Sequence, residues 1–391
     1  MIIPAANRLN QVEEYYFSQK LKEVRALAQQ GMKVINLGIG NPDLPPSPAT
    51  IEELTRSARQ EQNHGYQPYR GTDALRQALA EWYQQTYGVA LDPDAEVLPL
   101  MGSKEGIFFI SQAFLNPGDQ VLVPDPGYPG YAATARLAGA KPIFYPLSEA
   151  SGWLPALHEL SRMDLSQVKI MWLNYPHMPT GVIATEADLR NLVDFARKRS
   201  ILLCHDNPYS LVLNPQKPLS ILKIDGAMEN CLELNSLSKS FNLAGWRVGM
   251  VMGQAAYLDA IVRVKSNMDS GQFLPIQLAA VQALKNPPEW HQTRNQRLAK
   301  RKKLVKHLFD LMNFQYQSQT AGMFVWAKAP DEIASVESYL DDLLHATGIF
   351  LTPGRVFGEK GRRYARASIC ADEARLEEAG SRIQRYLNQR H

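Results

Sequence analysis

The chain has 391 residues, of which 45% are hydrophobic and 21% are charged, as is usual for a folded protein with a sizeable core. Its 42 basic and 39 acidic residues leave a net charge of only +3. This balance excludes nucleic acid and an anionic membrane as the expected main partners.

Cysteine usage and the start of the chain indicate the compartment. The three cysteines are Cys204, Cys231 and Cys370, a set that predicts neither a disulfide framework nor a paired-cysteine metal site. The start lacks a charged and then apolar leader, and no 18-residue apolar run is present to span a bilayer. We therefore expect a cytoplasmic protein without a metal site.

The first quarter of the chain mixes helical patterns with short apolar runs. An amphipathic pattern predicts a helix over 8–31, and 34–40 is expected to form a strand that enters a Pro-rich loop at 41–48. Further helices are predicted at 49–62, 73–87 and 104–115, with an apolar strand at 96–101. The Pro-rich loop indicates a junction between two bodies.

From residue 120 onwards, short apolar strands alternate with helices. Strands are predicted at 120–123, 141–145, 169–173, 201–205, 231–234 and 246–251, and Thr185 with Asp188 forms a capping-box pattern for a helix at 186–199. This alternation predicts an α/β fold with a mainly parallel sheet that helices cover on both faces. Ligands bind beyond the carboxyl ends of such strands. Polar segments follow the strands at 102–104, 124–128, 174–181, 206–209 and 236–247, so we expect one site at this edge.

The C-terminal part is expected to form a smaller α+β unit together with the N-terminal arm. A long helix at 255–285 precedes a break at Asn286-Pro287-Pro288. The basic run from Arg294 to Lys306 carries apolar residues at helical spacing, which predicts a solvated helix face rather than a nucleic-acid patch. The expected domains are 1–48 (the arm and part of the small domain), 49–285 (the large domain) and 286–391 (the small domain).

A lysine in a serine-rich stretch carries the strongest chemical signal. Lys239 follows a predicted strand, with Ser236 and Ser238 before it and Arg247 eight residues after it. Such a lysine can form a Schiff base with an aldehyde, while arginine and serines can hold a phosphate. Pyridoxal 5′-phosphate (PLP) carries both groups and a ring that accepts electrons. An ordinary lysine in a surface turn is the other interpretation of this segment.

Two further segments fit the same cofactor. Gly102-Ser103-Lys104 lies between a strand and a helix, where exposed amides and the helix dipole favour an anion. Asp206 ends a strand in Asp206-Asn-Pro-Tyr209, and a carboxylate beside a ring nitrogen favours the protonated ring. Each segment by itself is also compatible with a plain turn.

With these residues in place, the chain resembles the fold-type I PLP enzymes of the class I and II aminotransferase family. The resemblance runs from Gly38-Ile-Gly-Asn-Pro-Asp43 to Pro353-Gly-Arg-Val-Phe-Gly358 and Tyr364-Ala-Arg366. Segments 102–106, 124–129, 174–176 and 264–273 are most similar to the LL-diaminopimelate aminotransferase-like branch, and also recur in relatives of broader specificity. The resemblance implies ping-pong transfer of an amino group between an L-amino acid, LL-diaminopimelate or a broader set, and a 2-oxo acid.

The resemblance also implies roles for single residues. Lys239 would bind the cofactor and move the proton at the substrate Cα. Asp206 would keep the ring nitrogen protonated, and Tyr209 would face the ring hydroxyl. Arg366 would clamp the substrate α-carboxylate, assisted by the backbone at Ile39 and Gly40.

The remaining implied contacts concern the ring face and the phosphate. Tyr128 would stack on the ring, and the phosphate shell would comprise Gly102, Ser103, Lys104, Ser236, Ser238 and Arg247. Tyr66 would reach the phosphate of a neighbouring subunit. This last role implies a homodimer with composite sites.

One position departs from the family pattern. The usual Asn-Pro-Thr-Gly is Met178-Pro-Thr-Gly181 here, so a thioether stands where an amide donates to the ring oxygen. Losing that bond would cost on the order of 1.5–3 kcal/mol, with Tyr209, His177 or a water left to hold the oxygen. We expect lower turnover and a displaced pH titration of the cofactor. Asn41 likewise stands where the diaminopimelate branch commonly has aspartate.

Two alternatives to transamination stay open at this point. The first is PLP-dependent β-elimination, as in cystathionine β-lyase-like relatives, which would release pyruvate and ammonia from a cysteine conjugate. The second is a weakly catalytic PLP-binding regulatory protein, which Met178 alone supports. A nicotinamide-binding fold is excluded because no Gly-x-Gly-x-x-Gly follows the first strand.

Overall fold

The centre of the molecule is a mixed sheet of seven strands. A computed structural model describes residues 2–12, 14 and 16–389, and the strand order is β2-β8-β7-β6-β5-β3-β4. Strands β3 to β7 run parallel, whereas β8 is antiparallel to both neighbours. The expected mainly parallel sheet is confirmed. The strands are β2 Val97–Leu100, β3 Gln120–Asp125, β4 Lys141–Pro146, β5 Val168–Asn174, β6 Leu202–Asp206, β7 Cys231–Ser236 and β8 Gly249–Gly253.

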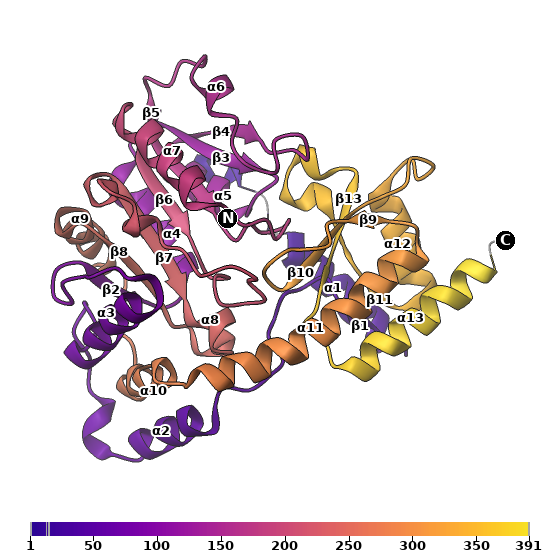
Figure 1. The fold of residues 1–391 in the computed structure, drawn as a ribbon, viewed down its shortest axis with the longest axis horizontal. Helices are drawn as coiled ribbons and strands as arrows, with labels where there is room; N and C mark the ends of the chain where they lie inside the picture. The colour runs from indigo at the N-terminus through magenta and orange to yellow at the C-terminus, as the bar shows by residue number, and fades with distance from the viewer. Residues whose placement is uncertain (1, 13, 15, 390–391) are drawn as a thin grey trace.

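Helices cover both faces of this sheet (Figure 1). Alternate strand residues point to opposite faces, so Val121 and Val123 pack with α4, α5 and α9, whereas Leu122 and Met171 pack with α3 and α7. The helices of this part are α2 Pro48–Ala58, α3 Asp73–Tyr87, α4 Ser103–Phe114, α5 Gly130–Leu137, α6 Leu157–Leu160, α7 Glu186–Arg197, α8 Leu237–Ser240, α9 Ala255–Lys265 and α10 Leu274–Leu284. The capping box of Thr185 and Asp188 is present at the start of α7.

A smaller unit joins the two ends of the chain, as the sequence predicts. Strand β1 (Ile35–Asn36) pairs in parallel with β11 (Ile349–Phe350). The four-stranded antiparallel sheet has the order β12-β13-β10-β9, with β9 Gln315–Tyr316, β10 Phe324–Lys328, β12 Thr352–Pro353 and β13 Tyr364–Ser368. Its helices are α1 Tyr16–Gln29, α11 Pro288–Leu311, α12 Val336–Thr347 and α13 Glu373–Asn388, and α11 runs along both units (Figure 1).

The expected long helix at 255–285 is wrong. The chain forms α9 and α10, with an irregular segment at 266–273 between them. Lys265 Nζ lies 2.8 Å from Asp269 Oδ1, which also accepts from the amide of Gly271 at 3.1 Å. Gly271 has a φ of +82°, a conformation that an α-helix cannot contain. These local bonds replace the helical ones.

Two other boundaries differ from the expectation. The predicted strand at 246–251 begins only at Gly249, because Ala244–Trp246 forms a 3₁₀ turn and Arg247 has a φ of +57°. The predicted helix at 8–31 is a 3₁₀ turn at Asn7–Gln11 followed by α1 from Tyr16; residues 13 and 15 lie outside the described part.

The basic run on α11 is not a solvated face throughout. Arg294, Arg301 and Lys302 are only 4%, 0% and 7% exposed, so the prediction is wrong for these three residues. Arg301 donates to both carboxylate oxygens of Asp43, at 2.6 and 2.9 Å. The helix therefore uses cationic side chains to anchor the loop that follows β1, where charge pairing makes burial tolerable.

None of the helices in the described ranges combines the length and the apolar character needed to cross a bilayer.

Candidate active site

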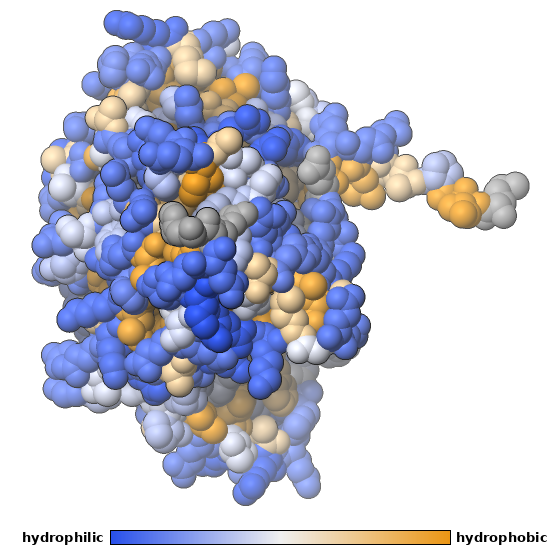
Figure 2. Space-filling model, turned by 90° about the vertical axis from the view of Figure 1, so that its right-hand side faces the viewer, coloured by the Kyte–Doolittle hydropathy of each residue, from blue (hydrophilic) through white to orange (hydrophobic). Residues whose placement is uncertain are grey.

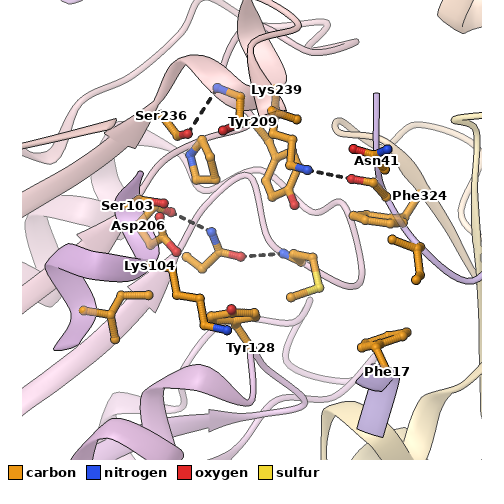
Figure 3. Close-up of a pocket in the computed structure, with 18 of the residues that line it drawn as sticks. Phe17, Asn41, Ser103, Lys104, Tyr128, Asp206, Tyr209, Ser236, Lys239 and Phe324 are labelled. Atoms are coloured by element: carbon orange, nitrogen blue, oxygen red, sulfur yellow. Dashed lines mark hydrogen bonds between the residues drawn. The ribbon is translucent and has the colours of Figure 1, made fainter. Parts of the chain in front are cut away.

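A cavity of about 810 Å³ opens at the carboxyl edge of the central sheet, between the two units (Figure 3). It collects most residues that the sequence analysis singled out, from segments far apart in the chain. The predicted site residues that line it are Ile39, Gly40, Ser103, Lys104, Tyr128, Asp206, Tyr209, Ser236, Ser238, Lys239, Arg247 and Arg366.

Lys239 lies on the short helix α8, directly after β7. Ser236 caps this helix, its Oγ accepting from the amide of Ser238 at 3.2 Å. The Lys239 Nζ donates to the carbonyl oxygen of Gly40 at 2.6 Å, across the cavity (Figure 3). Burial lowers the pKa of Lys239, and the nearby Arg366 and Arg247 act in the same direction. A lowered pKa increases the fraction of neutral amine, which is the nucleophilic form.

Asp206 ends β6 and presents a buried carboxylate. Its Oδ2 accepts from the hydroxyl of Tyr131 at 2.8 Å, whereas Oδ1 is buried and has no hydrogen-bond partner among the described residues. Burial raises the pKa of Asp206 to about 6, although Tyr131 and His205 oppose the effect. A buried acceptor without a donor is costly unless a ligand supplies one. The protonated nitrogen of a PLP ring is such a donor.

An anion cradle lies at the start of α4. Gly102 has a φ of +89°, and a Cβ built there would lie 2.1 Å from Nη2 of Arg247. Nη1 of Arg247 lies 3.5 Å from Ser238 Oγ and donates to the carbonyl oxygen of Ala244 at 3.0 Å. A guanidinium, serine hydroxyls and a helix N-terminus fit a phosphate. Gly102 itself does not line the cavity. Because it has no side chain, the guanidinium of Arg247 can occupy the adjacent space and line the cavity.

Arg366 reaches the cavity from β13 between aromatic rings. Its guanidinium carbon lies 3.9 Å from the ring centre of Phe324 and 4.4 Å from that of Phe357. Nη2 donates to the carbonyl oxygen of Gly38 at 2.6 Å, and Nη1 lies 3.2 Å from Met178 Sδ. These contacts hold the guanidinium in one orientation, as a carboxylate clamp requires.

The cavity also contains residues that the sequence analysis missed. Tyr131 binds Asp206 and stacks on Trp172 with a ring separation of 4.8 Å and an angle of 5°. Phe17, from α1, and Phe324, from β10, line the mouth of the cavity (Figure 3). Tyr131 lies three residues after Tyr128, and this proximity in the sequence is the signal that could have identified it. No local pattern marks Phe17, because α1 reaches the cavity only through the folding of the N-terminal arm.

Met178, His177 and Tyr66 differ in whether they reach the cavity. Met178 lines the cavity, in the place that the family pattern indicated. His177 does not line it: the side chain is 3% exposed and its Nδ1 lies 2.8 Å from Thr180 Oγ1, so the suggestion that His177 replaces the missing amide is wrong. Tyr66 is 92% exposed and does not line the cavity of its own chain.

Comparison with known proteins establishes the family. The sequence model described as "Aminotransferase class I and II" matches residues 32–383. The chain belongs to the class I and II aminotransferases. The LL-diaminopimelate aminotransferase of Dehalococcoides mccartyi (strain CBDB1) is 39% identical over 386 residues, which cover 97% of this chain and 98% of that enzyme.

Solved structures agree with this assignment. The apo form of BacF from Bacillus subtilis is 34% identical, with a TM-score of 0.94 over 99% of this chain and 98% of that one. The aromatic aminotransferase of Pyrococcus horikoshii OT3 is 27% identical, with a TM-score of 0.87 over 95% of this chain and 99% of that one. This aminotransferase is a PLP-dependent transferase, and the open acceptor of Asp206 and the cradle at Gly102 fit that cofactor.

Proposed function

We propose that this aminotransferase exchanges an amino group between an L-amino acid and a 2-oxo acid by a ping-pong mechanism, with LL-diaminopimelate among its amino donors. The observation that carries the proposal is the presence in one cavity of a half-buried lysine amine with a lowered pKa and a buried carboxylate with an unbonded oxygen. When bound, PLP supplies an aldehyde that links covalently to an amine and a ring that withdraws electrons from the substrate Cα.

The chain's own residues then have distinct tasks. Lys239 Nζ would hold the cofactor through its aldehyde, and its amine would move the proton at the substrate Cα. Asp206 Oδ1 would accept a hydrogen bond from the protonated ring nitrogen. Tyr209 would bind the ring oxygen, because the thioether of Met178 has no hydrogen-bond donor. Arg366 binds the substrate α-carboxylate, so that the Cα–H bond is the one presented to Lys239.

The cofactor is held at its other groups as well. Ser103, Lys104, Ser236, Ser238 and Arg247 bind the phosphate, and Tyr128 packs on the ring. Phe17 and Phe357 reduce the access of water to the cavity mouth, which strengthens the charged contacts inside.

The charge of the cavity supports a substrate with more than one carboxylate. Of the basic side chains in its described lining, Lys104, Lys239 and Arg247 are assigned to the cofactor, which leaves Arg366 and Arg25 for two carboxylates; the acidic side chain is Asp206. Diaminopimelate carries two carboxylates, and the relative from Dehalococcoides bears its name. Glutamate with 2-oxoglutarate satisfies the same charge requirement and is the matched comparison.

A second copy of the chain is part of this proposal. The N-terminal segment extends from the body (Figure 2), and its Ile2 and Ile3 are 96% and 87% exposed. Apolar side chains so exposed favour burial against a partner. We propose a homodimer in which Tyr66 completes the phosphate site of the other subunit. The division into 1–48, 49–285 and 286–391 belongs to the same proposal.

Single-substrate experiments test the reaction. The cofactor-loaded enzyme receives one amino acid at a time without an oxo acid, and the cofactor absorbance and released oxo acid are measured. A transaminase converts one equivalent and stops until an acceptor is added. Continued release of pyruvate and ammonia from a cysteine conjugate would instead show β-elimination. Conversion of LL-diaminopimelate alone supports a narrow specificity, whereas conversion of methionine, aromatic and acidic substrates shows a broad one.

A further inference from the structure

A buried histidine and a buried glutamate lie in contact behind Asp206, on the face of the sheet that turns away from the cavity. His205 precedes Asp206 in β6, and successive strand residues point to opposite faces. His205 pairs in register with Glu233 of β7, and the two residues are 1% and 0% exposed. Neither residue lines the cavity, and neither has a part in the reaction described above.

Both ring nitrogens of His205 lie against oxygen acceptors. Nδ1 is 2.8 Å from Glu233 Oε2. Nε2 is 2.9 Å from the carbonyl oxygen of Tyr175 and 3.3 Å from the amide nitrogen of the same residue. The shorter contact requires Nε2 to donate, whereas the longer one, from the Tyr175 amide, requires it to accept; donation to both oxygen acceptors would place a hydrogen on Nε2 as well as on Nδ1. Only the imidazolium form of histidine donates from both nitrogens.

The carboxyl group of Glu233 accepts hydrogen bonds from more than one element. Its Oε1 accepts from the hydroxyl of Tyr83 at 2.9 Å, and its Oε2 accepts from the amide of Ile221 at 2.9 Å. Together with His205, three groups therefore converge on this one buried carboxyl. Burial, together with Glu233, raises the pKa of Tyr83, so this phenol stays a neutral donor.

Apart from Asp206, the titratable groups around the pair include phenols that stay neutral. Burial raises the pKa of Tyr87 and of Tyr175 above their ordinary values. Tyr87 shares a hydrogen bond with Ser210 at 2.5 Å. Within the described residues, His205 is the cation found within 4.0 Å of Glu233.

We propose that His205, held as an imidazolium by Glu233 and the Tyr175 carbonyl, is a positioning residue that keeps Asp206 ionised in the cavity. The inference rests on the proposed role of Asp206. Burial raises the pKa of Asp206, and the charge of His205 is one of the effects that lower it. Without the imidazolium, the carboxylate would be protonated at a higher pH and could not hold the proton of the ring nitrogen.

His205 also fixes the geometry on the cavity side. By binding the Tyr175 carbonyl it anchors the segment that carries Asn174. The Asn174 Nδ2 donates to the backbone oxygen of Asp206 at 2.6 Å, and its Oδ1 accepts from the amide of Met178 at 2.7 Å. One buried histidine therefore supports both the charge and the position of Asp206.

Neutron diffraction of the cofactor-loaded wild-type enzyme tests the charge assignment directly. We expect deuterium on both ring nitrogens of His205 and none on Glu233. A single deuterium on the ring, or one on the Glu233 carboxyl, overturns the proposal. This measurement needs no variant and does not depend on the role of Asp206.

Variants test the consequence for the reaction. For His205→Asn we expect kcat to fall at least about tenfold, KM for the amino donor to change by less than about threefold, and the acidic limb of the kcat profile to move to higher pH by about one unit. Glu233→Gln is expected to give the same profile, because the imidazolium loses its counter-charge. Tyr83→Phe is the matched control; it removes one hydrogen bond from Glu233 and leaves the charges, so the profile stays at the wild-type position.

The outcomes separate this proposal from the proposed function. An unchanged pH profile in His205→Asn refutes the positioning role, even when kcat falls, since a merely structural role lowers kcat without moving the limb. Retained activity in Asp206→Asn refutes the role of Asp206 instead. If His205→Asn fails to fold, Glu233→Gln and the neutron map decide the question.

Discussion

The sharpest stability prediction concerns Asp206→Asn in the cofactor-free protein. Burial raises the pKa of Asp206 from 3.8 to about 6, so the folded state holds this proton more tightly than the unfolded state does. A folded-state carboxyl pKa above the unfolded value destabilises the fold once the group ionises, and the penalty develops as pH rises from 3.8 to 6. The difference of about 2.2 units at about 1.36 kcal/mol per unit gives about 3 kcal/mol at pH 8.

The same linkage gives the penalty at lower pH. At pH 4 it falls to about 0.5 kcal/mol, because Asp206 is then protonated in the folded state and half-protonated in the unfolded state. Asparagine cannot ionise, so the variant lacks this dependence. Between pH 4 and pH 8 the wild type should therefore lose about 2.5 kcal/mol relative to Asp206→Asn.

Thermal unfolding of both cofactor-free proteins across this pH range is the assay. With an unfolding entropy of about 2.1 cal/mol/K per residue, 2.5 kcal/mol corresponds to a change of about 3 °C in the difference between the two midpoints. Asp331→Asn, at a fully exposed carboxylate, is the control and should follow the wild type. A midpoint difference that stays constant with pH, or that changes in the opposite direction, would refute the account of Asp206.

Four further predictions follow from the site. Met178→Asn restores a donor to the ring oxygen, so the pH titration of the cofactor absorbance should move and turnover should rise; identical curves and rates would dismiss the idea. Gly102→Ala places a Cβ against Arg247, so cofactor affinity in a fluorescence titration should fall by about tenfold or more, equivalent to about 1.4 kcal/mol. Gly88→Ala is its control, since Gly88 also has a positive φ but has open space around its Cβ position. Arg366→Lys replaces a planar guanidinium, which can bind both oxygens of a carboxylate, with a single ammonium. The kcat/KM for the amino-acid donor should therefore fall by roughly 100-fold, with cofactor affinity unchanged. If sites are composite, mixing Lys239→Ala with Tyr66→Ala chains should restore activity in hybrid dimers, whereas two inactive proteins that stay inactive would argue against shared sites.

Much of the fold follows from local sequence pattern. Each apolar run predicted between 120 and 234 forms a strand, because runs of this length bounded by turns fit a sheet whose inner strands are buried on both faces. Since the carboxyl ends of parallel strands meet at one edge, strand position alone brought Asp206 and Lys239 into the same cavity. The helix Asp73–Tyr87 was predicted at its observed bounds, where Thr72 caps its start and Gly88 ends it.

Other features depend on contacts between distant segments and have no local signature. The break between α9 and α10 is stabilised by the buried pair of Lys265 and Asp269. The two residues are four positions apart, a spacing that in the sequence is equally typical of an ion pair on a continuous helix. Arg301 lies in a basic run whose pattern predicts a solvated helix face. In the structure it is buried and pairs with Asp43, which is 258 residues away in the sequence. Tyr131 acts on Asp206 across 75 residues. Such pairings appear only when the chain is folded.

The central claim is that Lys239 binds the cofactor aldehyde covalently, and reduction with borohydride followed by peptide mass spectrometry tests it most directly. The account predicts a pyridoxyl-phosphate adduct on Lys239 in the wild type, and no adduct on any other lysine. The adduct should be absent from Lys239→Ala. An unmodified Lys239 in reduced, cofactor-saturated wild-type enzyme, or an adduct on a different lysine, would contradict it.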